Sequence, residues 1–264
     1  MFLHANSGMS GISAVCGVPH LTFVPTQLPG YVDSPFNVAY LRWAGRLWQD
    51  TAMTVPAVAD GDPVRRIVCG STYYDAPSDA ARPLLWDEGG GKWSLSFDGV
   101  DDRLVGASVT GWQNTKTVGL SCLFATGGSR WACGQGNNDP TEELAIARQS
   151  SGAGYMDVGA GLGPYVEPAG VTGGAYSSTV WVQSTAAGTT SLSCYQGGVL
   201  LSGSVSGSGL TPNAATGVAF MVGAARSTSL LYMYGRIAGV VVCTTALGST
   251  DRAALDTYLA ALHT

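Results

Sequence analysis

Three aspartates, Asp98, Asp101 and Asp102, fall within the run DGVDD. Carboxylate oxygens are ligands that Ca²⁺ prefers in proteins, so one interpretation of the run is a calcium site. The spacing is not that of an EF-hand loop, which needs oxygen ligands at alternate positions and a closing glutamate. The alternative is a turn in which Asp98 accepts backbone N–H bonds and Gly99 supplies the permissive dihedral angles. We favour the turn and, apart from this calcium alternative, predict no cofactor.

Aromatic and amide side chains in loops are the residues that could bind a sugar. Aromatic rings can stack on sugar rings, and amides or carboxylates can bond hydroxyl groups or a cation. The alternative is that the tryptophans fill the core and that the Asn-Asn-Asp run is an ordinary turn, and we favour it for each aromatic residue. The predicted ligand-binding residues are Trp112, Trp131, Asn137, Asn138, Asp139 and Tyr165, with Tyr155 as a further aromatic candidate.

The composition limits the classes of partner. The chain has 264 residues, 45% of them hydrophobic and 12% charged, with a formal net charge of -5. Such a low share of charge is typical of extracellular or particle-exposed modules. The 13 basic residues are scattered, apart from Arg65-Arg66, so we expect no nucleic-acid partner. No apolar run is long enough for a membrane span, and the N-terminal residues lack the basic start and apolar core of a secretory signal.

The six cysteines are an even number, which permits a disulfide framework, but no CxxC motif or zinc-type Cys/His spacing occurs. Cys122, Cys194 and Cys243 lie in apolar strand patterns, where free cysteine behaves as a small buried residue. We therefore favour free thiols over disulfides.

Alternating apolar runs predict strands near the end of the chain. Ser191–Tyr195 and Val199–Val205 are joined by Gly197-Gly198, a dipeptide suited to a two-residue hairpin turn. Val218–Val222 and Gly235–Cys243 are more continuously hydrophobic, as strands inside a two-layer structure are. Further strands are predicted at Tyr40–Trp48, Thr115–Ala125, Glu143–Gln149 and Thr179–Ser184.

Two other segments have distinct predictions. Trp93–Phe97 and Arg103–Val109 are expected to form a hairpin with the three aspartates at its tip. Ser249–His263 is predicted to be a helix with Thr250 as its N-cap. Its apolar residues, all on one face, are Leu255, Leu259 and Leu262.

Residues 1–38 contain four prolines and little periodicity, and we expect an extended arm, followed by one domain over residues 39–264. The arm is interpreted as a tether that docks the domain onto a larger assembly. The alternative is an intramolecular cover in which Phe23 or Phe36 fills the edge of the domain.

Two blocks of sequence carry a family resemblance. One runs from Gly188 to Leu262 and contains GTT, GG, VGAARS, GRIAGVVVC and DRAALDTYLA in that order, and the other is LSFDGVDDRLVG at Leu95–Gly106. Together they resemble the laminin-G-like domains of the concanavalin A-like lectin/glucanase superfamily. The resemblance implies an all-β fold, an antiparallel jelly-roll β-sandwich, here with a short C-terminal helix. It also implies a long loop at Ile67–Ala81, since relatives have a long, variable loop in that place.

Glycosidases of that superfamily carry two glutamates flanking an aspartate on one strand, so that all three side chains project to one face. The glutamates of this chain, none of them in such a run, are Glu88, Glu142, Glu143 and Glu167. The sequence also contains no GxSxG, HExxH or GxxxxGK[ST] motif. We therefore predict that the protein is not an enzyme, and a glycoside hydrolase would need an atypical site.

The leading functional prediction is a structural protein of a phage particle, either a capsid decoration or a tail appendage, that displays the lectin-like sandwich for adhesion or assembly. Its expected partners are other virion proteins, host-surface glycans and further copies of itself. The alternative is a carbohydrate-binding module of a secreted bacterial protein. The predicted location is accordingly the virion, or the extracellular space in the alternative.

Overall fold

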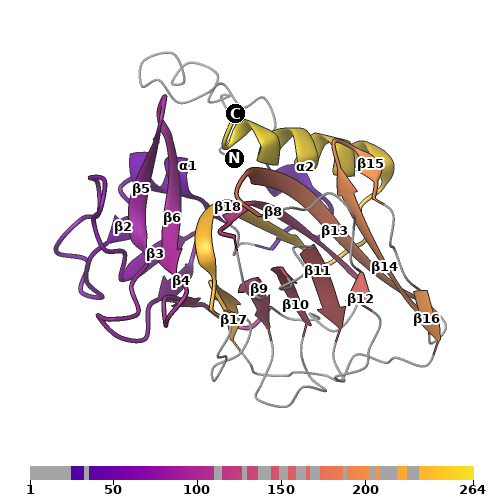
Figure 1. Cartoon of the computed structure of the whole chain (residues 1–264), viewed down its shortest axis with the longest axis horizontal. Helices are drawn as coiled ribbons and strands as arrows, with labels where there is room; N and C mark the ends of the chain where they lie inside the picture. Colours follow the sequence, from indigo (N-terminus) through magenta and orange to yellow (C-terminus); the bar gives the residue numbers. More distant parts are fainter. Residues whose placement is uncertain are drawn as a thin grey trace, which may run out of the picture.

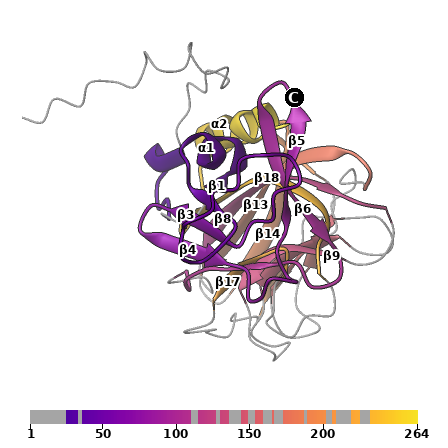
Figure 2. The same ribbon diagram turned by 90° about the vertical axis from the view of Figure 1, so that its left-hand side faces the viewer.

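The computed structural model describes residues 25–32, 36–109, 115–126, 130–135, 144–148, 154–158, 165–166, 173–186, 189–201, 206–208, 219–224 and 232–264. These residues form an all-β sandwich of two antiparallel sheets with a short C-terminal helix, as the sequence predicted (Figure 1). The layers are the helix α2, sheet A beneath it and sheet B on the other side of sheet A (Figure 2). Neither described helix is long and apolar enough to cross a membrane.

Sheet A has the order β15-β14-β13-β8-β18-β6-β5, with β1 beside β18 and β16 beside β14. Its strands are β1 (Phe36–Asn37), β5 (Leu84–Gly89), β6 (Lys92–Asp98), β8 (Lys116–Phe124), β13 (Tyr176–Ala186), β14 (Thr189–Gln196), β15 (Val199–Leu200), β16 (Ser206–Ser208) and β18 (Tyr234–Cys243).

Sheet B has the order β12-β11-β10-β9-β17-β7-β4-β3-β2. Its strands are β2 (Leu47–Trp48), β3 (Arg66–Cys69), β4 (Thr72–Asp75), β7 (Leu104–Val105), β9 (Arg130–Gln135), β10 (Leu144–Arg148), β11 (Gly154–Val158), β12 (Tyr165–Val166) and β17 (Phe220–Val222).

The predicted central strand, β8, shows how alternation divides sheet A into two faces. Val118, Leu120 and Cys122 point into the core between the sheets. Gly119 and Ser121 point to the outer face, where α2 (Ser249–Ala261) packs. A Cβ atom at Gly119 would lie 2.8 Å from Leu259 Cδ1, so the absence of a side chain there lets the helix dock closely.

The helix buries the three leucines that the sequence placed on one face, Leu255, Leu259 and Leu262. Its predicted N-cap, Thr250, is wrong. Gly248 is the N-cap, and it makes no side-chain capping bond. The helix begins at Ser249, the first residue of the predicted segment, so the cap falls two residues before Thr250.

The predicted first strand, Tyr40–Trp48, is wrong in its first half. Residues Val38–Trp43 form a short helix, α1, and only β2 at its end is a strand. Asn37 causes this change, since its side chain accepts a hydrogen bond from the backbone N–H of Tyr40 and caps the helix. Val38 and Leu41 then face the core from successive turns.

The loop predicted at Ile67–Ala81 is also wrong, because the segment contains the β3–β4 hairpin of sheet B. Its Tyr74 is fully buried and packs edge-to-face against Phe36 and Phe220. Burial of a large aromatic side chain requires an ordered backbone. Buried and partly exposed residues alternate in β3, which is the strand that pairs with β4.

The predicted Gly197-Gly198 hairpin is confirmed, with both glycines at positive φ (59° and 75°) between β14 and β15. The predicted strands at 218–222 and 235–243 are present as β17 and β18, but they belong to different sheets. Part of the predicted arm also belongs to the sandwich. Phe36 pairs with Val240 of β18 and is buried in the core, as the intramolecular-cover alternative predicted, whereas residues 1–24 lie outside the described residues.

The predicted burial of the strand cysteines is confirmed. Cys122, Cys194 and Cys243 are buried free thiols, and so is Cys133. Burial raises the pKa of Cys133 and of Cys243 to about 12, so both thiols are protonated at neutral pH.

Candidate functional site

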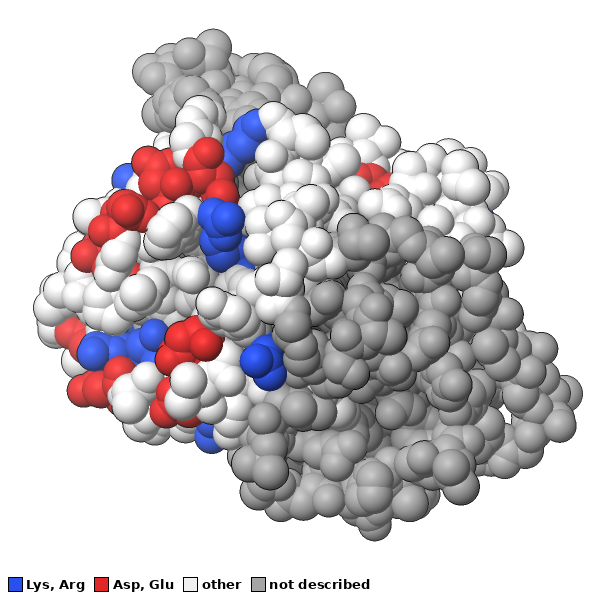
Figure 3. Space-filling view, viewed as in Figure 1, with Lys and Arg blue, Asp and Glu red and all other residues white. Residues whose placement is uncertain are grey.

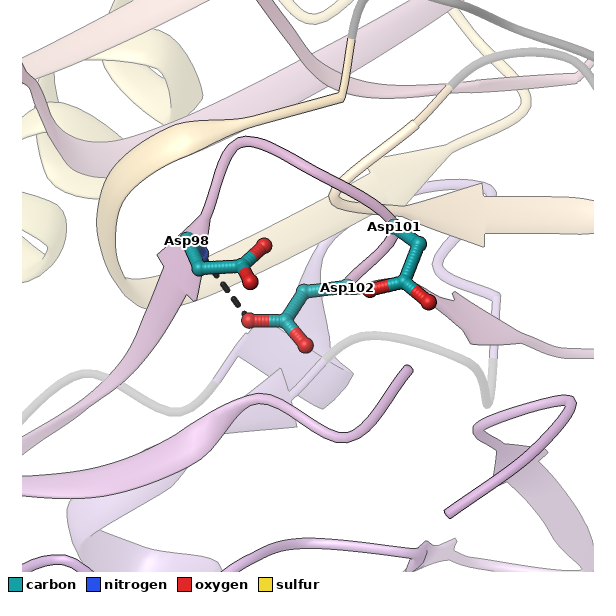
Figure 4. Close-up of side chains that lie close together, drawn as sticks. All are labelled: Asp98, Asp101 and Asp102. Atoms are coloured by element: carbon teal, nitrogen blue, oxygen red, sulfur yellow. Dashed lines mark hydrogen bonds between the residues drawn. The ribbon is translucent and has the colours of Figure 1, made fainter. Parts of the chain in front are cut away.

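The three aspartates of DGVDD lie together where the chain passes from sheet A to sheet B (Figure 4). The predicted hairpin is wrong here, because β6 pairs in sheet A whereas β7 pairs with β17 and β4 in sheet B. The run is therefore a corner between the sheets, with Leu104 buried immediately after it. The predicted clustering holds, since one carboxylate oxygen from each of Asp98, Asp101 and Asp102 lies within 4.8 Å of the others.

The hydrogen bonds of this acidic corner are those of the predicted turn. Asp98 Oδ1 accepts the backbone N–H of Val100 at 2.8 Å, and Gly99 has a φ of +81°. Asp102 Oδ2 accepts the backbone N–H of Asp98 at 2.9 Å. These bonds explain why aspartates occur at both ends of the corner.

Asp102 is only 4% exposed. Burial raises its pKa to about 7, and the nearby Asp98 and Asp101 carboxylates add to the rise, while the Asp98 N–H opposes it. Among the described residues, these three carboxyl groups are the ones that could hold a divalent cation, and Asp102 would have to lose its proton to do so.

A second polar group lies on the outer face of sheet A, where α2 does not cover β5 and β6. We call Trp86, Glu88, Ser94, Tyr176, Arg236 and His263 the outer cluster. Strand alternation explains its position, because the intervening residues Leu85 and Leu95 point into the core. Strand register brings its members together, with Trp86 opposite Ser94 and Arg236 one strand further in, opposite Ser96.

Glu88 is the hub of the outer cluster. Its Oε1 accepts hydrogen bonds from Ser94 Oγ at 2.5 Å and from the hydroxyl of Tyr176, and its Oε2 accepts one from Arg236 Nη1 at 2.7 Å. Burial and the bond to Glu88 both raise the pKa of Tyr176, so its phenol stays protonated and acts as a donor. The carboxylate is therefore held by three donors from three different strands.

Arg236 lies between two aromatic rings. Its guanidinium carbon is 5.2 Å from the ring centroid of Trp86 and 5.7 Å from that of Tyr176. Within the described part of the chain, only Nη1 has a protein acceptor, so Nε and Nη2 are left as donors. The side chain is 25% exposed, and the neighbouring Trp86 is 41% exposed. The arrangement presents a partly exposed indole ring next to unused N–H groups.

His263, just beyond the end of α2, closes one side of the cluster. Its ring stacks on Tyr176 at a centroid distance of 4.9 Å, and its Nδ1 lies 2.8 Å from Ser121 Oγ. Burial lowers the pKa of His263, and the charge of Lys92 lowers it further. Figure 3 shows acidic and basic side chains beside one another over the part of the surface formed by β3 to β6, on the left of the view.

The structure does not bring the predicted ligand-binding residues together in its described part. Trp131, in β9, is 4% exposed, as expected if it fills the core. Tyr165 begins β12, which β10 and β11 separate from β9. Four predicted residues, Trp112, Asn137, Asn138 and Asp139, lie outside the described residues.

The sequence interpretation missed the outer cluster. The segment LLWDEGGGKWSLSF contains the pattern that could have revealed it. Two strand-like runs, LLWDE and KWSLSF, flank three glycines there and predict a hairpin. The structure contains that hairpin as β5 and β6. Arg236 and Tyr176 could not have been added in this way, because they lie far along the chain.

Comparison with known proteins supports the fold. A sialidase from Trypanosoma rangeli, in complex with 2-keto-3-deoxy-D-glycero-D-galacto-2,3-difluoro-nononic acid, superposes with a TM-score of 0.54 at 16% identity, over 84% of this chain and 34% of that one. The same sialidase in complex with sialic acid gives a TM-score of 0.52 at 15% identity, with the same coverage of both chains. This chain thus spans about a third of the length of those sialidase chains.

A smaller neighbour is the CBM40 of the Ruminococcus gnavus IT-sialidase bound to α2,6 sialyllactose. It has a TM-score of 0.44 at 13% identity, over 54% of this chain and 83% of that one, which is too low to carry an argument. No family model matches the sequence, and no curated protein matches it. The comparisons therefore establish a β-sandwich fold that also occurs in sialidase chains.

Proposed function

We propose that this protein is a carbohydrate-binding β-sandwich that binds its ligand on the outer cluster of sheet A. The observation that carries the proposal is the exposed Trp86 ring beside Arg236, which has N–H groups without an acceptor among the described residues. An aromatic face supplies stacking for a sugar ring, and a few fixed donors beside it orient the hydroxyl groups. Both parts lie on paired strands, which hold them in place.

The same geometry favours binding over hydrolysis. Retaining and inverting glycosidases generally need two carboxyl groups facing each other across the scissile bond. Glu88 is the carboxylate of the outer cluster, and its two oxygens accept hydrogen bonds from Ser94, Tyr176 and Arg236. The outer cluster therefore offers one carboxyl group where such a hydrolase needs two.

A glycan array tests the proposal. The wild-type protein is expected to bind a subset of the glycans, and Trp86→Ala is expected to weaken that binding by about tenfold or more, as loss of a central aromatic contact does. Trp43→Ala is the matched control, because Trp43 on α1 is also 41% exposed and is not a member of the outer cluster. Absence of glycan binding by the wild type, or equal effects of the two substitutions, would contradict the proposal.

We also propose a setting for this binding, namely display on a phage particle as a capsid decoration or tail appendage, with copies of the chain assembled beside other virion proteins. The low share of charged residues, 12%, supports an exposed module, and the proposed attachment is the part of the predicted arm that precedes the residues packed in the sandwich, namely residues 1–24. Antibody labelling of purified particles in the electron microscope checks this setting. Recovery of the protein only in particle-free culture medium would favour a secreted bacterial module instead.

A further inference from the structure

We infer that the outer cluster prefers acidic sugars, meaning sugars that carry a carboxylate, and this inference rests on the proposed carbohydrate-binding function. The evidence comes from the way Arg236 is held. Glu88 binds only Nη1 of the guanidinium, so one edge of the group is fixed by the protein. The Nε and Nη2 donors, which have no acceptor in the described part of the chain, provide the remaining hydrogen-bonding capacity.

A carboxylate is the ligand group that fits those donors best. The planar guanidinium can offer two parallel N–H bonds to the two oxygens of a carboxylate, which a sugar hydroxyl cannot match. The Trp86 ring, 5.2 Å from the guanidinium carbon, is near enough for the sugar ring that carries the carboxylate to stack on it. One residue would then recognise the charge and the other the ring.

The charge around the outer cluster is mixed, and the whole chain carries a formal charge of -5. Alternation places Lys92 on the same outer face as Ser94 and Ser96. Two further carboxylates lie at the edge strand β5, where Asp60 accepts the backbone N–H of Asp87. The expected preference for an acidic sugar therefore rests on the unused edge of the Arg236 guanidinium and not on net charge.

The experiment measures affinity for matched pairs of ligands by isothermal titration calorimetry at low salt. One pair is sialyllactose and its methyl ester, and the other is a glucuronate-terminated and a glucose-terminated disaccharide. The two pairs distinguish a sialic acid from a uronic acid as the source of the carboxylate. In at least one pair the wild type is expected to bind the acid about tenfold more tightly than its neutral partner, with the preference falling as salt is added.

Variants then assign the preference to residues. Arg236→Gln is expected to reduce the acid-over-neutral ratio to below about threefold. The control is Arg66→Gln, which removes an ion-paired arginine from sheet B and is expected to leave the ratio unchanged. If Arg236→Gln does not fold, Lys92→Gln provides a second variant, with a smaller expected fall in the ratio.

The outcomes separate the two proposals. Equal wild-type affinity for acid and neutral partners in both pairs, or an unchanged ratio in Arg236→Gln, overturns the preference for acidic sugars and leaves carbohydrate binding standing. Binding to no glycan of any kind overturns the proposed function itself.

Discussion

Two clusters that each combine an arginine, a carboxylate and an exposed aromatic ring lie on opposite sheets of this sandwich. In sheet B, Arg66 pairs with Asp75 at 2.7 Å, and its guanidinium lies 4.5 Å from the ring centroid of the exposed Tyr73. In sheet A, Arg236 pairs with Glu88, also at 2.7 Å, beside the exposed Trp86. Composition and ion-pair distance therefore do not distinguish the two clusters.

The hydrogen bonds distinguish them. Arg66 gives Nε and Nη2 to the two oxygens of Asp75 and Nη1 to the backbone carbonyl of Thr51, each at 2.7 Å. The bonds to Asp75 raise the pKa of Arg66 further. Arg236 gives only one N–H group to its carboxylate. An arginine with every nitrogen bonded to protein stabilises the fold, whereas one with donors left over can bind a ligand.

The largest expected effect concerns Asp102, a buried carboxyl group that forms no ion pair within the described part of the chain. Its pKa rises from an ordinary 3.8 to about 7 on folding. Because the folded state keeps the proton, stability should fall as the pH rises from 4 through 7, by about 4 kcal/mol in total. Urea unfolding at pH 4 to 8 checks this, and Asp102→Asn, which can still accept the Asp98 N–H, should remove most of the fall.

Added calcium tests the alternative interpretation of the acidic corner, namely that it is a cation site. If the wild type at pH 8 gained stability with added calcium and Asp102→Asn did not, the corner would be a cation site and not a simple turn. The turn interpretation predicts no such difference.

The next effect tests the two arginines directly. Arg66→Gln should lower the free energy of unfolding by about 2 kcal/mol, because Asp75 and the Thr51 carbonyl lose charge-assisted donors together. Arg236→Gln should cost less than about 1 kcal/mol, because Glu88 keeps Ser94 and Tyr176 as donors. Chemical denaturation of the two variants measures both values, and a larger loss for Arg236→Gln would reverse the assignment of roles.

The smallest expected effect on stability concerns His263. This histidine belongs to the outer cluster of sheet A and has no counterpart in the sheet-B cluster. Folding lowers the pKa of His263, so the unfolded chain binds a proton more readily and stability is lost as the pH falls below about 6.5. The charged groups beside the ring are Lys92 and Glu88. Asp102 acts in the opposite direction, so the test compares His263→Asn with the wild type, each in the Asp102→Asn background. Identical pH profiles would show that protonation of His263 is not coupled to folding.

Local patterns in the sequence predicted much of the fold. The Gly197-Gly198 hairpin, the central strand β8 and the leucine face of α2 each depend on residues close together in the chain. The errors arose where a single local contact changed the outcome. The side chain of Asn37 caps a helix where apolar residues suggested a strand, and the Asp98–Asp102 bond turns the chain into the other sheet.

The candidate site was harder to predict for a geometric reason. Glu88 bonds Tyr176 and Arg236, which are 88 and 148 positions away in the sequence. Strand order alone brings these residues together, since β5, β6, β18, β8 and β13 follow one another in sheet A. The sequence does not reveal the strand order, so Glu88, Tyr176 and Arg236 stand in it as single residues in separate segments.

The central claim is that Trp86 on sheet A contacts the sugar, and nuclear magnetic resonance tests it most directly. The indole N–H signal of each tryptophan in the labelled protein can be assigned by substitution, with Trp86→Phe and Trp43→Phe as the first two variants. Titration with a glycan that binds on the array should shift the Trp86 signal most and leave the Trp43 signal in place. A larger shift at Trp43, or at the originally predicted Trp112 or Trp131, with the Trp86 signal unchanged, would contradict the account.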